Sequence, residues 1–286
     1  METLSSMVKH KWGLNPDYFT DHDCGFYLRA MEQIKTLGFD GVLGFGPLWP
    51  EHHGSTLALS DIKKGLADTE LSLMQLHTDW KNMASPDENE RREATDFYKR
   101  WADYALELEA EELVIHPGAP FPVRDRRRAV KLYVNSLTEL AEHIKGTTLK
   151  LSLENEGGEI EPEYRFGCTP SELRDIIEGV DSEGQIGICL DTSHAVSGGL
   201  DLKDAICQGG RYIISTHLHD TSIPDREEHL PPGKGLIDWR AVMKVFKKIE
   251  YSGPYIFEVD IIDTNVSWGE KVRFIRESKQ LIESLS

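Results

Sequence analysis

Six short apolar segments of the chain have the character of β-strands, and each of them ends in a histidine or a carboxylate. The six segments are LSLMQLH (ending at His77), LVIH (His116), LKLSLE (Glu154), IGICLD (Asp191), YIISTH (His217) and YIFE (Glu258). A side chain at the carboxyl end of a parallel strand points to the face where α/β enzymes carry out their chemistry. Six groups that can bind a metal, at equivalent positions, therefore predict one convergent site and favour metal-assisted catalysis.

Segments with a helical pattern separate these strands. Apolar residues spaced three and four apart give each such segment one apolar face, as an amphipathic helix requires. Helices are expected over residues 88–110, 125–145, 201–208, 238–249 and 269–284. Thr169-Pro170-Ser171-Glu172 predicts a further helix, with threonine as the N-cap, proline at the first helical position and glutamate closing a capping box.

The alternation of strands and helices predicts a TIM barrel. The six strand-end residues are spaced 26 to 41 residues apart, which suits repeated βα units joined by right-handed crossovers into a parallel sheet. GVLGF (41–45) indicates an earlier strand, and SMVKHKW is a weak candidate for the eighth. No GxGxxG or Walker-type loop follows a strand, which counts against a nucleotide-binding sheet. We therefore expect an α/β protein, one (β/α)8 barrel domain over residues 1–286.

Composition and charge restrict the partners. The formal net charge is −17, which opposes the neutralisation of phosphates on which general nucleic-acid binding depends, so nucleic acid is not an expected partner. No apolar run approaches the roughly 18 residues of a membrane span, and the N-terminus lacks a signal-peptide core, so we expect a cytoplasmic protein. Four cysteines without paired spacing predict reduced, mostly buried thiols.

Glu154, Asp191, His217 and Glu258 make a mixed oxygen and nitrogen ligand set from four successive strands. Such a set suits one divalent metal of the Mn²⁺, Mg²⁺, Co²⁺ or Zn²⁺ type, and the absence of thiolates disfavours a structural zinc. If all four groups are buried, each needs a partner, and one metal ion satisfies them together. Whether a second or third metal binds stays open.

Residues beside this set have more than one interpretation. Asp191 and His194, three residues apart, belong to one pocket, unless the aspartate only caps the following turn. His219 lies on the same strand face as His217 and is expected to support the site or to be solvated. Asp220 either orients a ligand histidine through its second ring nitrogen or forms a turn.

Several motifs resemble those of the xylose-isomerase-like TIM-barrel superfamily: VIHPG, ENEGG, GICLDTSHA, THLHDT, HLPPGKGLIDW and IFEVD. They occur in the family's order and at barrel spacing, between residues 38 and 260. The superfamily includes sugar and sugar-phosphate isomerases and epimerases, and the endonuclease IV type of abasic-site nuclease. The resemblance implies that Glu154, Asp191, His217 and Glu258 form the single metal site of the epimerases. It also implies that His194 contacts the substrate.

The nuclease branch of the superfamily adds ligands for a three-zinc cluster, whose counterparts here would be His77, His116, His194, Asp225 and His229. The segment PDREEHLPPGKG departs from the nuclease pattern, because three residues rather than one separate Asp225 from His229. HLPPGKG followed by DW is more similar to the small-molecule isomerase branch. On that interpretation His77, His116, His229 and Lys234 are expected to bind substrate, although His77 and His116 also suit core positions and Lys234 a turn.

The leading hypothesis is a metal-dependent sugar or sugar-phosphate isomerase or epimerase of carbohydrate metabolism that moves a proton through an enediolate. Glu154 and Glu258 are the expected acid and base, one removing the proton beside the carbonyl and the other returning one. Alternatives are an abasic-site nuclease with three zinc ions, a metal-dependent lyase or dehydratase of the same superfamily, and a sugar-binding barrel without activity. The sequence does not distinguish among carbohydrate and keto substrates, and it leaves the formation of a homo-oligomer open.

Overall fold

Eight parallel strands form a closed barrel in the order β1 to β8, which confirms the predicted TIM barrel. The computed structural model describes residues 9–20, 27–44, 58–117, 125–157, 166–180, 182, 184–224, 226, 228–260 and 266–286. The strands are β1 (Trp12–Leu14), β2 (Gly41–Gly44), β3 (Ser72–His77), β4 (Glu112–Ile115), β5 (Lys150–Glu154), β6 (Ile186–Asp191), β7 (Ile213–His217) and β8 (Tyr255–Phe257). Pairing of Trp12 with Tyr255 joins the first strand to the last and closes the barrel.

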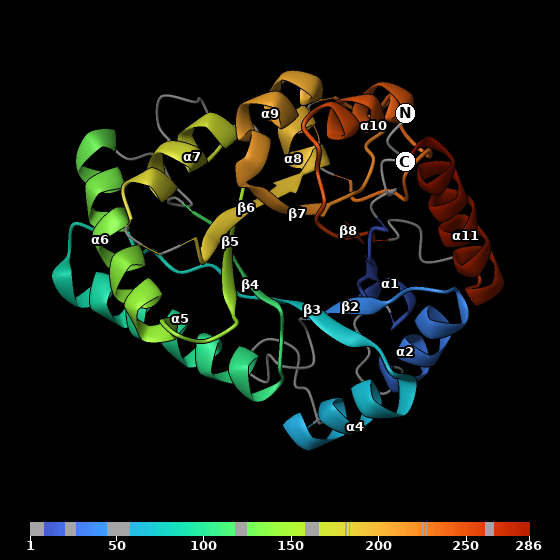
Figure 1. Ribbon diagram of the computed structural model, residues 1–286, viewed down its shortest axis with the longest axis horizontal. Helices are drawn as coiled ribbons and strands as arrows, with labels where there is room; N and C mark the ends of the chain where they lie inside the picture. The colour runs from blue at the N-terminus through green and yellow to red at the C-terminus, as the bar shows by residue number, and fades with distance from the viewer. Residues whose placement is uncertain are drawn as a thin grey trace, which may run out of the picture.

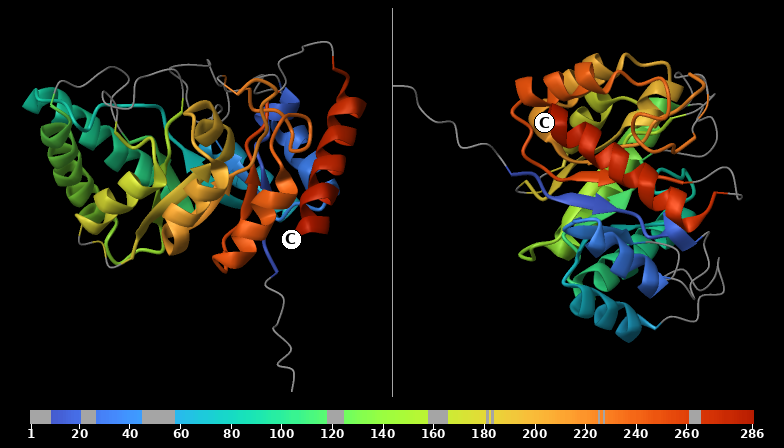
Figure 2. Two further views of the ribbon diagram at one scale, coloured as in Figure 1. Left: turned by 90° about the horizontal axis from the view of Figure 1, so that it is seen from above. Right: turned by 90° about the vertical axis from the view of Figure 1, so that its right-hand side faces the viewer.

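Helices surround the strands (Figure 1). They are α1 (Asp17–Thr20), α2 (Tyr27–Thr36), α4 (Leu59–Thr69), α5 (Glu88–Glu107), α6 (Arg126–Ile144), α7 (Pro170–Glu178), α8 (Thr192–Ser197), α9 (Leu202–Gly209), the 3₁₀ turn η2 (Gly210–Tyr212), α10 (Trp239–Lys248) and α11 (Trp268–Leu285). Helix α11, red in Figures 1 and 2, packs against α10 and α1, so that the last helix meets the first around the barrel. Each described helix is too short or too polar to cross a lipid bilayer.

Local sequence signals account for the helix starts, with one correction at α7. Thr169 caps this helix by accepting a hydrogen bond from the Glu172 amide at 3.2 Å, and Pro170 occupies the first turn, as predicted. The predicted capping box does not form, because the Glu172 side chain does not return to the Thr169 amide. The Glu172 carboxylate accepts from the Gly167 amide at 2.6 Å and pairs with Arg126, so it fastens the preceding loop and α6 instead.

Two further expectations are confirmed only in part, and a third needs correction. The first strand begins at Trp12, where the candidate segment SMVKHKW ends, and the early part of that segment lies outside the described residues. The strand expected over 41–45 is confirmed over Gly41–Gly44, and Phe45 is not described. Cysteines are less buried than expected: among those described, Cys189 is buried and Cys168 half-buried, whereas Cys207 is exposed.

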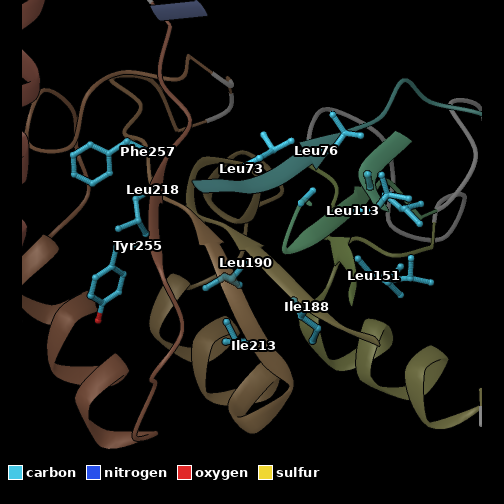
Figure 3. Close-up of a cluster of buried hydrophobic side chains, with 14 of the residues drawn as sticks. Leu73, Leu76, Leu113, Leu151, Ile188, Leu190, Ile213, Leu218, Tyr255 and Phe257 are labelled. Atoms are coloured by element: carbon cyan, nitrogen blue, oxygen red, sulfur yellow. The ribbon is translucent and has the colours of Figure 1, made fainter. Parts of the chain in front are cut away.

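A continuous apolar layer joins the outer faces of the strands to the helices. Figure 3 shows part of it, with Leu73 and Leu76 from β3, Leu113 from β4, Leu151 from β5, and Ile188 and Leu190 from β6. Because successive side chains of a strand point to opposite faces, the residues that directly follow Leu76, Leu153 and Leu190 point into the barrel. This alternation turns His77, Glu154 and Asp191 inward at the carboxyl ends of β3, β5 and β6.

We predict that Leu113→Ala lowers the free energy of unfolding by about 2–5 kcal/mol, because it leaves a cavity in the layer between barrel and helices. Leu113 is fully buried, whereas Leu236 is 59% exposed. Leu236→Ala is therefore the matched control and should change stability by no more than about 0.5 kcal/mol. Urea unfolding of both variants measures the difference, and equal effects would contradict this description of the core.

Candidate metal centre

The structure brings four predicted ligands together at the carboxyl end of the barrel. Glu154, Asp191 and His217 are the last residues of β5, β6 and β7, and Glu258 directly follows β8. All four are buried, and one ligand atom from each lies within 4.8 Å of the others. Nδ1 of His217 lies 2.9 Å from Glu258 Oε2, 3.2 Å from Glu154 Oε1 and 3.8 Å from Asp191 Oδ2. Three carboxylates thus surround one imidazole nitrogen.

The residues present fit a divalent cation. Glu154 Oε1 and His217 Nδ1 are both buried without a hydrogen-bond partner among the described residues, although they face each other at 3.2 Å. Leaving such groups without a partner in a protein interior is costly. Oxygen and nitrogen atoms that converge on one point are the donor set that Mn²⁺, Mg²⁺, Co²⁺ and Zn²⁺ bind. A cation held between them would satisfy both atoms.

The charges of the site favour a positive group at its centre. Burial raises the pKa of Glu154, but the imidazoles of His217 and His116 outweigh burial and lower it well below its usual value. The pKa of Glu258 is also lowered, since His217 opposes the effect of burial. Burial lowers the pKa of His217, yet the surrounding acidic groups raise it well above its usual value. Glu154 and Glu258 are therefore ionised and favour a proton on the His217 imidazole when no metal is bound.

His77 and His116, whose role the sequence leaves undecided, both lie in the site. Nε2 of His77 is 3.2 Å from Glu154 Oε2 and 3.8 Å from Glu258 Oε1. Nε2 of His116 is 3.8 Å from the same atom, Glu154 Oε2. The ring centres of His77 and His116 are 4.9 Å apart. Ligand atoms of His77, His116 and Glu154 lie within 4.8 Å of one another. These three residues make a second group with the geometry of a metal site.

The structure also brings His194 and His229 to the site. Nδ1 of His194 lies 2.9 Å from the Asn155 carbonyl oxygen and 3.3 Å from Glu154 Oε1. His229 has a positive φ of 48°, a strained conformation that is more frequent at functional sites than elsewhere. Its ring nitrogen Nδ1 lies 4.0 Å from Glu258 Oε2.

Lys234 is not brought into this cluster. The Lys234 ammonium pairs with Glu277 of α11 at 2.7 Å and lies 4.8 Å from the centre of the Phe274 ring, so its contacts lead toward α11. Asp225, the doubtful zinc ligand, lies outside the described residues. The substrate-binding role of Lys234 stays a prediction.

Asp191 both caps a helix and takes part in the cluster. Its Oδ1 accepts from the His194 amide at 2.7 Å and so caps α8, and its Oδ2 lies 2.5 Å from His219 Nε2. Nδ1 of His219 lies 2.8 Å from the Ser193 hydroxyl, and the His219 ring stacks on His229 at 4.1 Å. His219 therefore supports the predicted ligand Asp191, one of the two roles that its place on the strand face of His217 allowed.

Asp220 forms a turn and does not orient a histidine. Its carboxylate accepts from the amides of Gly233 and Ile237 and from the indole of Trp239, which organises the loop between β7 and α10. The second ring nitrogen of His217 meets Gln75 Oε1 at 2.9 Å instead. Sequence reasoning missed Gln75, although it lies two residues before His77 and therefore on the same inward strand face.

We predict that the metal-free protein loses stability as the pH rises from about 6.5, the ordinary pKa of histidine, through the pKa of His116. Burial lowers the pKa of His116, but the carboxylates of Glu154 and Glu156 raise it to about 9. A raised histidine pKa contributes stability that is complete below the unfolded value and disappears above the folded value. Urea unfolding of chelator-treated protein at both ends of this range measures the loss, and His116→Gln should reduce it. An equal loss in that variant would contradict the assignment.

Comparison with known proteins places the chain in a family. Residues 31–278 match the family model described as xylose isomerase-like TIM barrel. A probable endonuclease 4 from Acholeplasma laidlawii (strain PG-8A) is 26% identical over 215 residues, which are 68% of this chain and 70% of that protein. The crystal structure of D-psicose 3-epimerase with D-tagatose from Clostridium cellulolyticum H10 superposes with a TM-score of 0.78 at 18% identity, over 96% of this chain and 99% of that one. The crystal structure of 3-keto-D-glucoside 4-epimerase from E. coli superposes with a TM-score of 0.73 at 19% identity, over 96% of this chain and 100% of that one. The chain belongs to the xylose isomerase-like TIM-barrel family.

Proposed function

We propose that this protein is a divalent-metal-dependent isomerase or epimerase that acts on a sugar or sugar phosphate by proton transfer. The observation that carries the proposal is the pair of buried carboxylates, Glu154 and Glu258, on the two sides of His217. They follow β5 and β8, which are separated in the barrel by β6 and β7, so they reach the centre of the site from different directions. The epimerase names of the two superposed structures support this choice of substrate class.

Glu154, Asp191, His217 and Glu258 would hold the metal. A bound divalent ion supplies a Lewis acid that polarises the substrate carbonyl and so makes the neighbouring carbon more acidic. The protein's own contribution is the fixed position of the ligands. Asp191 is held at Oδ1 by the His194 amide and at Oδ2 by His219, so its orientation does not depend on the ion.

Glu154 and Glu258 would exchange the proton with the substrate. One carboxylate removes the proton from the carbon beside the carbonyl, and the other returns a proton to a carbon or oxygen atom from its own side. The lowered pKa of each carboxyl group supports the removal step, because the ionised form that accepts a proton is present at neutral pH. The carboxylate that returns a proton must first take one up, from the substrate or from solvent. Return to the opposite side of the same carbon gives an epimer, and return to the neighbouring atoms gives an isomer.

Substrate oxygens would be bound by the histidines around the ligand set. His77, His116 and His194 all lie within 3.8 Å of a Glu154 oxygen, so a sugar that reaches this carboxylate also meets their rings. His229 lies beside Glu258, and its ring is 5.9 Å from the ring of His194. Lys234 would join them only after leaving its ion pair with Glu277.

We predict that Glu154→Gln and Glu258→Gln each lower kcat by about 10²–10⁴-fold, because an amide cannot accept or return the proton. Turnover of a panel of ketoses and their phosphates, assayed at saturating Mn²⁺ with the metal content measured, gives the comparison. Glu139→Gln, which changes an exposed carboxylate of α6, is the control and should keep wild-type turnover. Full turnover by a metal-loaded Glu154→Gln or Glu258→Gln variant would contradict the acid/base assignment.

An abasic-site nuclease with three zinc ions is the second candidate. The observation in its favour is the group of His77, His116 and Glu154, which shares Glu154 with the main ligand set and has the ligand types and spacing of an additional metal site. The probable endonuclease 4 relative also supports it. Against it stand the formal net charge of −17 and the spacing of Asp225 and His229. A lyase or dehydratase would use the same ligand set and differ in expelling a leaving group.

Metal analysis separates the two candidates. We predict that the purified protein saturated with Zn²⁺ keeps one tightly bound ion per chain after gel filtration and does not incise a duplex that contains an abasic site. His77→Ala combined with His116→Ala should leave that ion in place, because neither residue belongs to the main ligand set. About three tightly held zinc ions per chain, together with incision of the duplex, would establish the nuclease instead.

A further inference from the structure

A layer of polar side chains lies inside the barrel directly beneath the ligand set. Gln75, Ser152 and Ser215 each stand two residues before a strand-end residue, namely His77, Glu154 and His217, so they share its inward face. Glu112, the first residue of β4, extends the layer further from the site. All four are buried, and none takes part in the proposed proton transfer. A polar layer within a barrel core is costly unless its groups satisfy one another.

The hydrogen bonds of this layer have a defined direction. Glu112 Oε2 accepts from the Ser152 hydroxyl at 2.5 Å and from the Ser215 hydroxyl at 2.6 Å. A hydroxyl has a single hydrogen, so Ser215 can only accept its further bond from Gln75 Nε2, which lies 2.9 Å away. Nε2 of Gln75 is also 3.2 Å from Glu112 Oε2. The carboxylate therefore determines which end of the Gln75 amide faces it.

This orientation extends to the ligand histidine. With its nitrogen facing Glu112 and Ser215, Gln75 presents Oε1 to His217 Nε2 at 2.9 Å. A carbonyl oxygen only accepts, so Nε2 of His217 must carry the hydrogen. The other ring nitrogen, Nδ1, is then free of hydrogen in the neutral ring, and it is the atom that faces Glu154 and Glu258.

We propose that Gln75 and Glu112 are positioning residues that hold His217 in its Nε2–H tautomer and thereby select Nδ1 as the metal ligand. Partners that bind the second nitrogen of a ligating histidine fix the ring and its tautomer, and their loss typically weakens metal binding by about 10–100-fold. The inference rests on the proposed metal centre and does not depend on the proposed reaction. It also explains why a carboxylate is retained inside the barrel.

The test is Zn²⁺ binding by Gln75→Leu, which removes the acceptor of the His217 hydrogen while filling similar space. Competition with a chelator should show Zn²⁺ affinity about 10–100-fold below wild type. Long-range ¹H–¹⁵N NMR of Zn²⁺-loaded, histidine-labelled wild type should show His217 hydrogen on Nε2 only. In the variant, that hydrogen should exchange rapidly with water. The proposal would be overturned if the His217 ring hydrogen of the wild type were found on Nδ1. It would also be overturned if Gln75→Leu kept both the Zn²⁺ affinity and the hydrogen exchange rate of the wild type.

Gln185→Leu is the matched control for the substitution itself. Gln185 Nε2 donates to the carbonyl oxygens of Ile144, Thr147 and Leu149 at 3.2 or 3.3 Å, just before β6 and outside the polar layer. This variant should lose stability and keep wild-type Zn²⁺ affinity and tautomer. Equal weakening of Zn²⁺ binding in both leucine variants would mean that Gln75 acts only through stability, and would overturn its positioning role.

Glu112→Gln tests the far end of the layer and decides the question if Gln75→Leu does not fold. The amide can donate to Gln75, so the order of the bonds is no longer fixed, and Zn²⁺ affinity should fall while the fold is kept. Unchanged Zn²⁺ affinity together with an unchanged His217 hydrogen would overturn the proposal that Gln75 and Glu112 together select Nδ1 as the ligand. Neither Zn²⁺ affinity nor the position of the His217 hydrogen is measured with a sugar. Absence of sugar turnover would therefore contradict the proposed function without contradicting this inference.

Discussion

Three buried carboxylates around a single imidazole nitrogen are the interaction on which the account of this site depends. Glu154, Asp191 and Glu258 all approach Nδ1 of His217 inside the barrel, where like charges repel strongly and water does not separate them. Only a positive charge at the centre makes such an arrangement favourable. A proton on His217 provides it in the metal-free protein, and a divalent cation would provide it in the active one.

This arrangement results from the alternation of side chains between the two faces of each barrel strand. Leu76, Leu153 and Leu190 fix the outward face of β3, β5 and β6 by packing beneath the helices, and the next residue of each strand must then point inward at the carboxyl end. The same alternation places Gln75, Ser152 and Ser215 one layer below. Packing of the apolar face and placement of the ligands are thus a single constraint, because a one-residue slip in register would turn every ligand outward.

The fold and the convergence of the four candidate ligands could be predicted because both leave local patterns. Glu154, Asp191 and His217 stand at the ends of apolar runs, and regular spacing of those runs indicates a closed ring of βα units. Gln75 was missed because a polar residue within an apolar run does not reveal partners on distant strands. Glu112 was missed because it follows Glu111 directly before an apolar run, where a charged residue is ordinarily taken for a solvent-exposed one. Glycines around Lys234 indicate a loop, but they do not show that Glu277 of α11 lies beside the ammonium. Glu172 follows Thr169 at capping-box spacing, yet Gly167 and Arg126 compete for its carboxylate.

One site thus combines the proposed ligand set of a single metal centre with extra histidines that suit either a sugar pocket or further metals. The central claim is that Glu154, Asp191, His217 and Glu258 bind one metal ion. A crystal structure of the Mn²⁺-loaded protein, with anomalous diffraction recorded for manganese, tests it most directly. The account predicts one strong anomalous peak within the group formed by Glu154, Asp191, His217 and Glu258, with Nδ1 of His217 as its nitrogen ligand. A peak outside this group, or no peak at full Mn²⁺ saturation, would contradict the central claim.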